Sequence, residues 1–186
     1  FPDNLLELNN LIIYGPPGSG KYTEILYIIN KYSPNNLKYE KKILINYNKS
    51  EYFIKISDIH YEVDMELLGC NSKILWHEIY ASIQDIIKTK SNIGIILCKN
   101  FHLINNELLD IFYSYIQNNI INNCNIKFII ITEHISFFPN NILNICNIIK
   151  CEKHPISFYK LHEPKFKNSD IKNINNIKHF KYLKKN

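Results

Sequence analysis

The sequence contains no arginine: all 22 basic side chains other than histidine are lysine, and alanine occurs only once, at Ala81. Asparagine, isoleucine, lysine and tyrosine are abundant instead, which is the amino-acid usage that an AT-rich genome imposes. The net charge of +5 is therefore weak evidence for binding to nucleic acid. The missing arginine also excludes every mechanism in which an arginine of this chain stabilises a phosphate.

Long apolar runs are missing as well. The longest, such as Ile93 to Leu97 and Phe128 to Ile131, fall far below the roughly 20 residues that a membrane span needs. We therefore expect a soluble protein with no membrane partner. The chain begins at Phe1 and shows no charged segment followed by an apolar stretch, so we expect no signal peptide and interpret the chain as a piece of a longer one.

Cysteine pairs with metal-ligand spacing are also missing. Five cysteines are an odd number, and none forms a CxxC pair; they are Cys70, Cys98, Cys124, Cys146 and Cys151. We predict buried thiols in a reducing intracellular compartment, with no disulfide and no cysteine-bound metal.

Apolar segments alternate with segments of helical periodicity along most of the chain. Strands are predicted at 11–14, 52–56, 93–98, 126–132 and 148–151, and helices at 21–32, 72–88 and 105–121, with a helical turn at 139–144. Strands that are apolar on both faces indicate a parallel sheet. The pattern predicts an α/β fold of three layers, with a parallel sheet of about five strands and helices on both sides.

The loop after the first predicted strand has a phosphate-binding pattern. Its residues match GxxxxGK between a strand and a helix; they are Gly15, Pro16, Pro17, Gly18, Ser19, Gly20 and Lys21. Glycines let successive backbone N–H groups point at an anion, and the helix N-terminus adds favourable partial charge. The motif predicts that this P-loop binds ATP or ADP, with Lys21 on the β and γ phosphates.

The residue after Lys21 is usually Ser or Thr, whose hydroxyl ligates Mg²⁺, but here it is Tyr22. Two alternatives remain for a magnesium ion, which is a possible cofactor. Either Thr23 substitutes through a local shift, or the ion is held by water and phosphate alone. The sequence therefore assigns Tyr22 and Thr23 to the nucleotide site and leaves the metal ligands unknown.

Catalytic acids are missing from the expected place. The strand at 93–98 is followed by Lys99 and Asn100 rather than by a carboxylate, and Glu107 has the position of a helix-capping residue. Asp58 has the position of a turn cap, although it could instead supply the missing acid. We assign no catalytic residue.

Other polar residues have structural interpretations. His60, Glu62 and Asp64 alternate, which indicates the solvated side of an edge segment rather than a metal site. His102 and His134 have no nucleophile with a matching base beside them, so we interpret both as structural.

The segments 11–23 and 56–64, together with the strand at 93–98 and its helix, resemble the AAA+ module of replication factor C small subunits, the clamp loaders of DNA replication. The resemblance covers about positions 10 to 151 and is close only in the phosphate loop. It implies an AAA+ core at 1–154, followed at 155–186 by a Lys- and Asn-rich tail or the start of a truncated lid.

The chain departs from this family at three places. Cys98 and Lys99 replace the acidic strand end, Glu133 replaces a polar sensor, and Asn144-Ile145-Cys146 replaces the segment that carries the arginine finger. An arginine finger contributes on the order of 10³ to 10⁵ in rate, so little hydrolysis is expected.

The resemblance implies a clamp-loader-like subunit that binds ATP or ADP, with related AAA+ subunits and a sliding clamp as partners, in the nucleus or another replication compartment. The lysine-rich stretch from Lys165 to Lys185 could add weak, salt-sensitive contact with DNA. Two alternatives remain: an active P-loop ATPase of another kind, such as a helicase loader or nucleotide kinase, and a scaffold with a relic P-loop.

Overall fold

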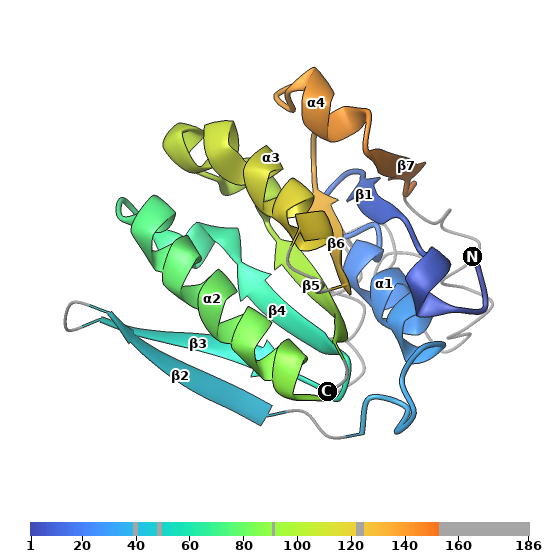
Figure 1. The fold of residues 1–186 in the computed structure, drawn as a ribbon. Helices are drawn as coiled ribbons and strands as arrows, with labels where there is room; N and C mark the ends of the chain where they lie inside the picture. The colour runs from blue at the N-terminus through green and yellow to red at the C-terminus, as the bar shows by residue number, and fades with distance from the viewer. Residues whose placement is uncertain (39–40, 48–49, 91, 122–124, 153–186) are drawn as a thin grey trace, which may run out of the picture.

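A computed structural model describes residues 1–38, 41–47, 50–90, 92–121 and 125–152 (Figure 1). The strands are β1 (Asn10–Tyr14), β2 (Lys41–Tyr47), β3 (Ser50–Ile56), β4 (His60–Asp64), β5 (Ile93–Lys99), β6 (Asn125–Thr132) and β7 (Cys146–Lys150). The α-helices are α1 (Lys21–Asn30), α2 (Ser72–Lys90), α3 (Asn106–Ile121) and α4 (Asn140–Leu143). Short 3₁₀ turns are η1 (Leu5–Glu7), η2 (Met65–Leu68) and η3 (Phe101–Leu103). The predicted tail at 155–186 lies outside the described residues.

The seven strands form one sheet in the order β2-β3-β4-β5-β6-β1-β7. The five strands from β4 to β7 in this order pair in parallel, whereas β2 and β3 form an antiparallel hairpin at one edge. The α/β class is confirmed, and five strands are parallel, although the whole sheet has seven strands rather than about five.

The prediction was wrong about one of those five strands. The segment at 52–56 is a strand, but it belongs to the antiparallel hairpin, and the parallel strand is β4. β2, also a strand, was not predicted. The reason for the error is that β4 carries polar residues at alternate positions, whereas β1, β5 and β6 contain continuous buried apolar runs.

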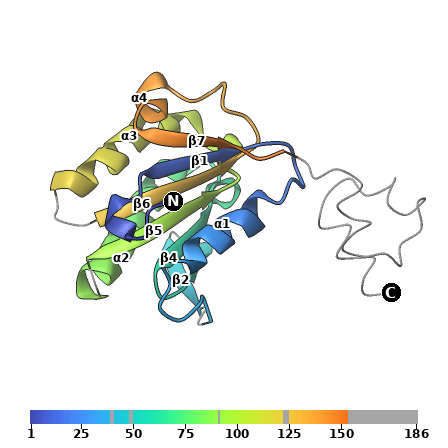
Figure 2. The same ribbon diagram turned by 90° about the vertical axis from the view of Figure 1, so that its right-hand side faces the viewer.

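Helices cover both faces of the sheet, which makes three layers (Figures 1 and 2). On one face, α2 and α3 pack against alternate strand residues such as Ile12, Ile96 and Phe128. On the other face, α1 packs against the neighbours of those residues, including Ile13 and Leu97. Successive side chains of a strand point to opposite faces, so the continuous apolar runs are explained by burial on both sides.

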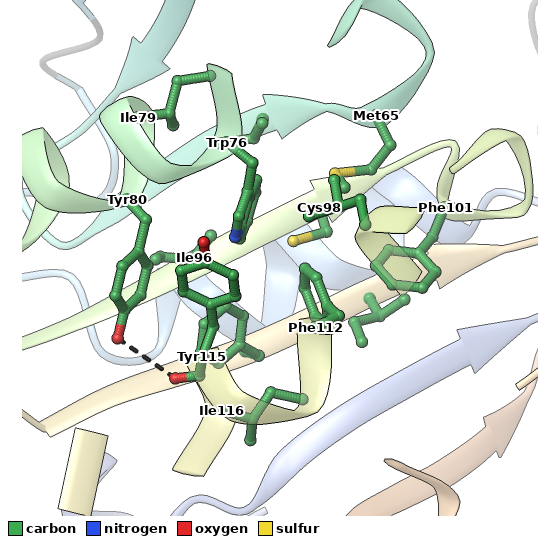
Figure 3. Packing of buried hydrophobic residues seen from close by; sticks show 14 of the residues in the cluster. Met65, Trp76, Ile79, Tyr80, Ile96, Cys98, Phe101, Phe112, Tyr115 and Ile116 are labelled. Atoms are coloured by element: carbon green, nitrogen blue, oxygen red, sulfur yellow. Dashed lines mark hydrogen bonds between the residues drawn. The ribbon is translucent and has the colours of Figure 1, made fainter. Parts of the chain in front are cut away.

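An aromatic cluster fills the space between α2, α3 and the sheet (Figure 3). Trp76 is fully buried and packs against Tyr80, Phe112 and Tyr115, with ring centroids 5.1 to 6.4 Å apart. The hydroxyl of Tyr80 donates a hydrogen bond to the backbone carbonyl of Tyr115 at 3.3 Å. The cluster therefore holds the two helices together over the middle of the sheet.

The cysteine prediction holds in part. Cys98, Cys146 and Cys151 are buried free thiols, as predicted, but Cys70 is exposed in the turn before α2. Cys124 lies outside the described residues. None of the described helices combines the length and the apolar character that crossing a lipid bilayer requires.

Replacing Trp76 with alanine should lower the free energy of unfolding by about 3 to 5 kcal/mol, because removal of the indole leaves a cavity that the neighbouring rings cannot fill. Urea unfolding followed by circular dichroism measures the change. Leu67, which is 65% exposed, is the control, and Leu67→Ala should stay within about 0.5 kcal/mol of the parent. Equal losses in both variants would contradict this description of the core.

Candidate nucleotide-binding site

The P-loop joins β1 to α1 at the carboxyl ends of the parallel strands, where ligands of such sheets bind. Gly18 and Gly20 have φ angles of 75° and 87°, in the left-handed region that favours glycine. Gly20 is the N-cap of α1, and no side chain caps the helix there. The first N–H groups of α1 are thus left for a ligand at the loop.

Lys21 folds back over the loop. Its Nζ donates hydrogen bonds to the backbone carbonyls of Gly15 at 2.7 Å and Pro16 at 2.8 Å, and its side chain is buried. Burial lowers the pKa of Lys21, and the negative charge of Glu133 partly opposes this shift. The ammonium group therefore lies in the concavity of the loop, where it would meet the phosphates.

Ser19 supplies a second polar group that fits a phosphate. It is buried, and its Oγ has no hydrogen-bond partner among the described residues. Buried polar groups are normally paired, so an unpaired hydroxyl inside a phosphate loop fits an anion that would accept from it. Together with Lys21 and the glycines, Ser19 fits the phosphates of a nucleotide. Pro16 and Pro17 are exposed on the outer side of the same loop.

The loop is tied to the end of β7. The backbone N–H of Cys151 donates to the carbonyl of Tyr14 at 2.8 Å, and the thiol of Cys151 lies 3.4 Å from the carbonyl oxygen of Ser19. A Cβ at Gly15 would lie 2.0 Å from the Cys151 carbonyl oxygen, which no side chain tolerates. Gly15 is thus required for the loop to pass β7 closely.

Tyr22 points away from the loop toward β4. Its hydroxyl donates to Glu62 Oε1 at 2.6 Å and accepts from Lys55 Nζ at 3.3 Å. Burial raises the pKa of Tyr22 to about 12, and the neighbouring carboxylate of Glu62 adds to the shift, so the phenol stays a donor. The sequence did not single out this contact between α1 and β4.

Glu62 is buried at the centre of a polar cluster. Besides Tyr22, its oxygens face His60 Nε2 at 3.2 Å, Lys55 Nζ at 3.6 Å and Lys99 Nζ at 3.7 Å. Burial alone would raise the pKa of Glu62, but the hydrogen bonds from His60 and Tyr22 and the charges of the two lysines outweigh it and lower the pKa to about 2. Glu62 is therefore an ionised carboxylate whose Oε1 takes part in two hydrogen bonds, while its Oε2 faces the ammonium group of Lys99.

These contacts correct the prediction of a solvated edge. His60 is fully buried, Glu62 is 4% exposed, and β4 lies inside the sheet between β3 and β5. Because a carboxylate accepts only, His60 Nε2 carries the proton and its Nδ1 faces the hydroxyl of Ser57. Among the described residues, no cluster of three or more His, Cys, Asp and Glu side chains could hold a metal ion.

Lys99 ends β5 at the place of the missing acid. Its Nζ lies 3.7 Å from Glu62 Oε2, 4.0 Å from Asp64 Oδ2 and 5.3 Å from the centre of the Tyr22 ring. Asp64 also accepts hydrogen bonds from the Asn100 amide at 3.0 and 3.2 Å. A positive charge thus stands beside the first turn of α1.

Glu133 follows β6 on the other side of the loop. The negative charge of its carboxylate raises the pKa of Lys21, and its Oε2 lies 3.9 Å from His102 Nε2. The rings of His102 and His134 lie 6.2 Å apart, edge to face. The Nδ1 atom of His102 is buried and has no hydrogen-bond partner within the described part of the chain. Glu133 is thus an acid whose charge reaches Lys21. The sequence predicted only that it replaces a polar sensor residue.

Two further candidates lie away from the site. Asp58 Oδ2 accepts from the Ser33 hydroxyl at 2.7 Å and the Asn35 backbone at 3.1 Å, in the turn that follows α1. The turn-cap interpretation is confirmed. Asp58 lies just before β4, at the amino-terminal end of this strand, whereas the P-loop lies at the carboxyl ends of the parallel strands. Thr23 is exposed and sits about 200° around α1 from Lys21, so it cannot replace Tyr22 without rotation of the helix.

Comparisons with known proteins agree on the fold. No protein-family model matches the sequence, and no curated protein matches it. Among solved structures, AMPPCP-bound DnaA from Aquifex aeolicus matches with a TM-score of 0.57 and 11% identity, over 98% of this chain and 56% of that one. PCH-2 from C. elegans matches with a TM-score of 0.53 and 10% identity, over 96% and 51% of the two chains.

A variant of RuvB from Thermotoga maritima also matches, with a TM-score of 0.50 and 16% identity, over 83% of this chain and 41% of that one. The chain thus spans between 41% and 56% of the length of these three structures. Identities this low show the fold alone. This chain has the mostly parallel α/β fold of AAA+ P-loop cores.

Proposed function

We propose that this chain is an AAA+-type subunit that binds ATP or ADP at residues 15–23 and uses the nucleotide as a structural switch, with little hydrolysis of its own. The observation that carries the proposal is the P-loop itself. Lys21 and the unpaired Ser19 hydroxyl lie inside a loop that is closed by left-handed glycines. DnaA, which shares the fold, is bound to AMPPCP, an ATP analogue, in its structure.

Weak hydrolysis follows from the charges around the loop. A hydrolytic P-loop enzyme uses a carboxylate at a strand end to hold Mg²⁺ and a further group to orient water. β5 ends in Lys99, and the carboxylate of Glu62 is bonded to Tyr22 and His60 and faces two lysines. With no arginine in the sequence, this chain also has no finger for a neighbouring site.

A role inside an assembly fits the contact between the loop and β7. Cys151 touches both Tyr14 and Ser19, so a loop that changes on binding nucleotide would move the end of β7 with it. Such coupling gives a subunit without hydrolysis a use, because occupancy alone alters its shape. The resemblance to replication factor C small subunits makes a clamp-loader-type complex the proposed setting, with related AAA+ subunits and a sliding clamp as partners.

One observation favours a second candidate, an active ATPase. Glu133 is an acid close to Lys21, and His102 lies 3.9 Å from it, so the two could orient a water molecule. The measurement of turnover below separates the two candidates.

Lys21→Ala should abolish stabilisation by nucleotide, because the phosphates lose the buried cation of the loop. A ligand at about 100 times its Kd stabilises a protein by about 2.7 kcal/mol, which raises Tm by several degrees. Thermal unfolding with and without ADP measures the effect. The exposed Lys88 on the last turn of α2 is the control, and Lys88→Ala should keep the full shift. An unchanged shift in Lys21→Ala would disprove the assignment of the loop.

Intrinsic ATP turnover should stay below about 1 s⁻¹, the lower edge of ordinary enzymes. Phosphate release by the purified chain measures it. Faster turnover that disappears in Glu133→Gln would favour the active ATPase over the switch.

The chain should co-purify with AAA+ clamp-loader subunits from the same source, and ATP or ADP should strengthen the association. Size-exclusion chromatography of the mixed proteins is the measurement. Lys21→Ala should lose the nucleotide effect while remaining folded. Repeated failure of the parent chain to associate would reject the clamp-loader setting without touching nucleotide binding.

A further inference from the structure

The residues around the loop do not fit the magnesium ion that accompanies nucleotides in most P-loop proteins. There, a Ser or Thr hydroxyl after the lysine ligates the ion and an acid at a neighbouring strand end helps to hold it. Here the phenol of Tyr22 is bonded to Glu62 at 2.6 Å, and the strand end carries Lys99. The two positions that would hold the metal are therefore occupied by Tyr22 and Lys99, which are not available as metal ligands.

Glu62 is a poor replacement ligand, because donors and cations of the chain already surround its carboxylate. Oε1 accepts from the Tyr22 hydroxyl and His60 Nε2 and lies near Lys55, while Oε2 faces Lys99. A metal ion on Oε1 would have to displace Tyr22 and His60 inside a buried cluster, and one on Oε2 would lie against the ammonium group of Lys99. Glu62 acts instead as an anchor for Tyr22, with Lys99 beside them both.

Lys99 is a cation beside the first turn of α1. Its ammonium lies 5.3 Å from the centre of the Tyr22 ring, and Tyr22 belongs to the first turn of α1, next to Lys21. Its ion pairs with Glu62 and Asp64, at 3.7 and 4.0 Å, are longer than hydrogen bonds, and about a third of the side chain is exposed. Such long, partly solvated pairs hold a lysine weakly, so a phosphate oxygen can draw it away.

We propose that this site binds a nucleoside diphosphate or triphosphate without Mg²⁺, with the ammonium group of Lys99 supplying the positive charge that the metal supplies elsewhere. The proposal rests on the nucleotide binding proposed above. In it, Lys21 and Lys99 approach the phosphates from two sides, while the hydroxyl of Tyr22 stays bonded to Glu62. Nucleotide occupancy then depends on nucleotide concentration alone and not on free magnesium.

Isothermal titration of the purified chain with ADP and ATP, in buffer with Mg²⁺ and in buffer with EDTA, tests the proposal. The Kd should differ by less than about threefold between the two buffers. Lys99→Ala should weaken binding in EDTA by about tenfold or more, the usual effect of losing a charge-assisted hydrogen bond. Mg²⁺ should then restore part of the lost affinity, because the ion takes the place of the missing charge.

The control variant is Lys88→Ala, which removes the same charge from the far end of α2 and should bind as the parent does in both buffers. Circular dichroism confirms that each variant is folded. Binding by the parent only with Mg²⁺ would overturn the inference and leave the nucleotide site standing. No effect of Lys99→Ala, or an equal loss in both buffers, would also overturn it. Absence of binding in either buffer would overturn both proposals.

Discussion

The buried charge of Glu62 connects the sheet to α1, the helix that follows the P-loop. A carboxylate without water is tolerated only when donors or cations surround it, and here each comes from a different part of the chain. Lys55 comes from β3, Lys99 from β5 and Tyr22 from α1, while His60 lies on β4 itself. Four elements therefore meet at one carboxylate. Its low pKa means that this cluster stabilises the fold above the ordinary titration range of Glu and weakens as the pH falls toward about 2.

The same cluster explains why the sequence predicted the loop well and its surroundings poorly. The P-loop depends on local features, namely glycines, a lysine and a helix that follows an apolar strand, and all of these are visible within about a dozen residues. β4 depends on partners far away in the sequence. Glu62 looks solvated in the alternating segment from His60 to Asp64, because nothing local shows that two lysines and a tyrosine will surround it. The parallel strand was therefore placed one segment too early, on β3.

A comparable limit applies to the individual acids. Asp58 could be placed correctly, because an acid just after a strand commonly accepts from a nearby turn, and Ser33 and Asn35 provide one. The position of Glu133 near Lys21 could not be predicted in this way, because it results from β6 lying beside β1 in the sheet. The order of strands is a property of the whole fold. Residues that meet through it, such as Glu133 and Lys21, are found only once that order is known.

The distribution of charge around the loop separates binding from hydrolysis. Binding needs positive charge and N–H donors toward the phosphates, and Lys21, Lys99 and the start of α1 all lie there. Hydrolysis needs a carboxylate at the strand end, and β5 ends instead in Lys99, whose ammonium group faces the buried carboxylate of Glu62. In the proposed function, a lysine at this strand end has two effects at once. It offers a cation to the phosphates, and it leaves the end of β5 without an acid, so that the nucleotide would remain bound as a structural ligand.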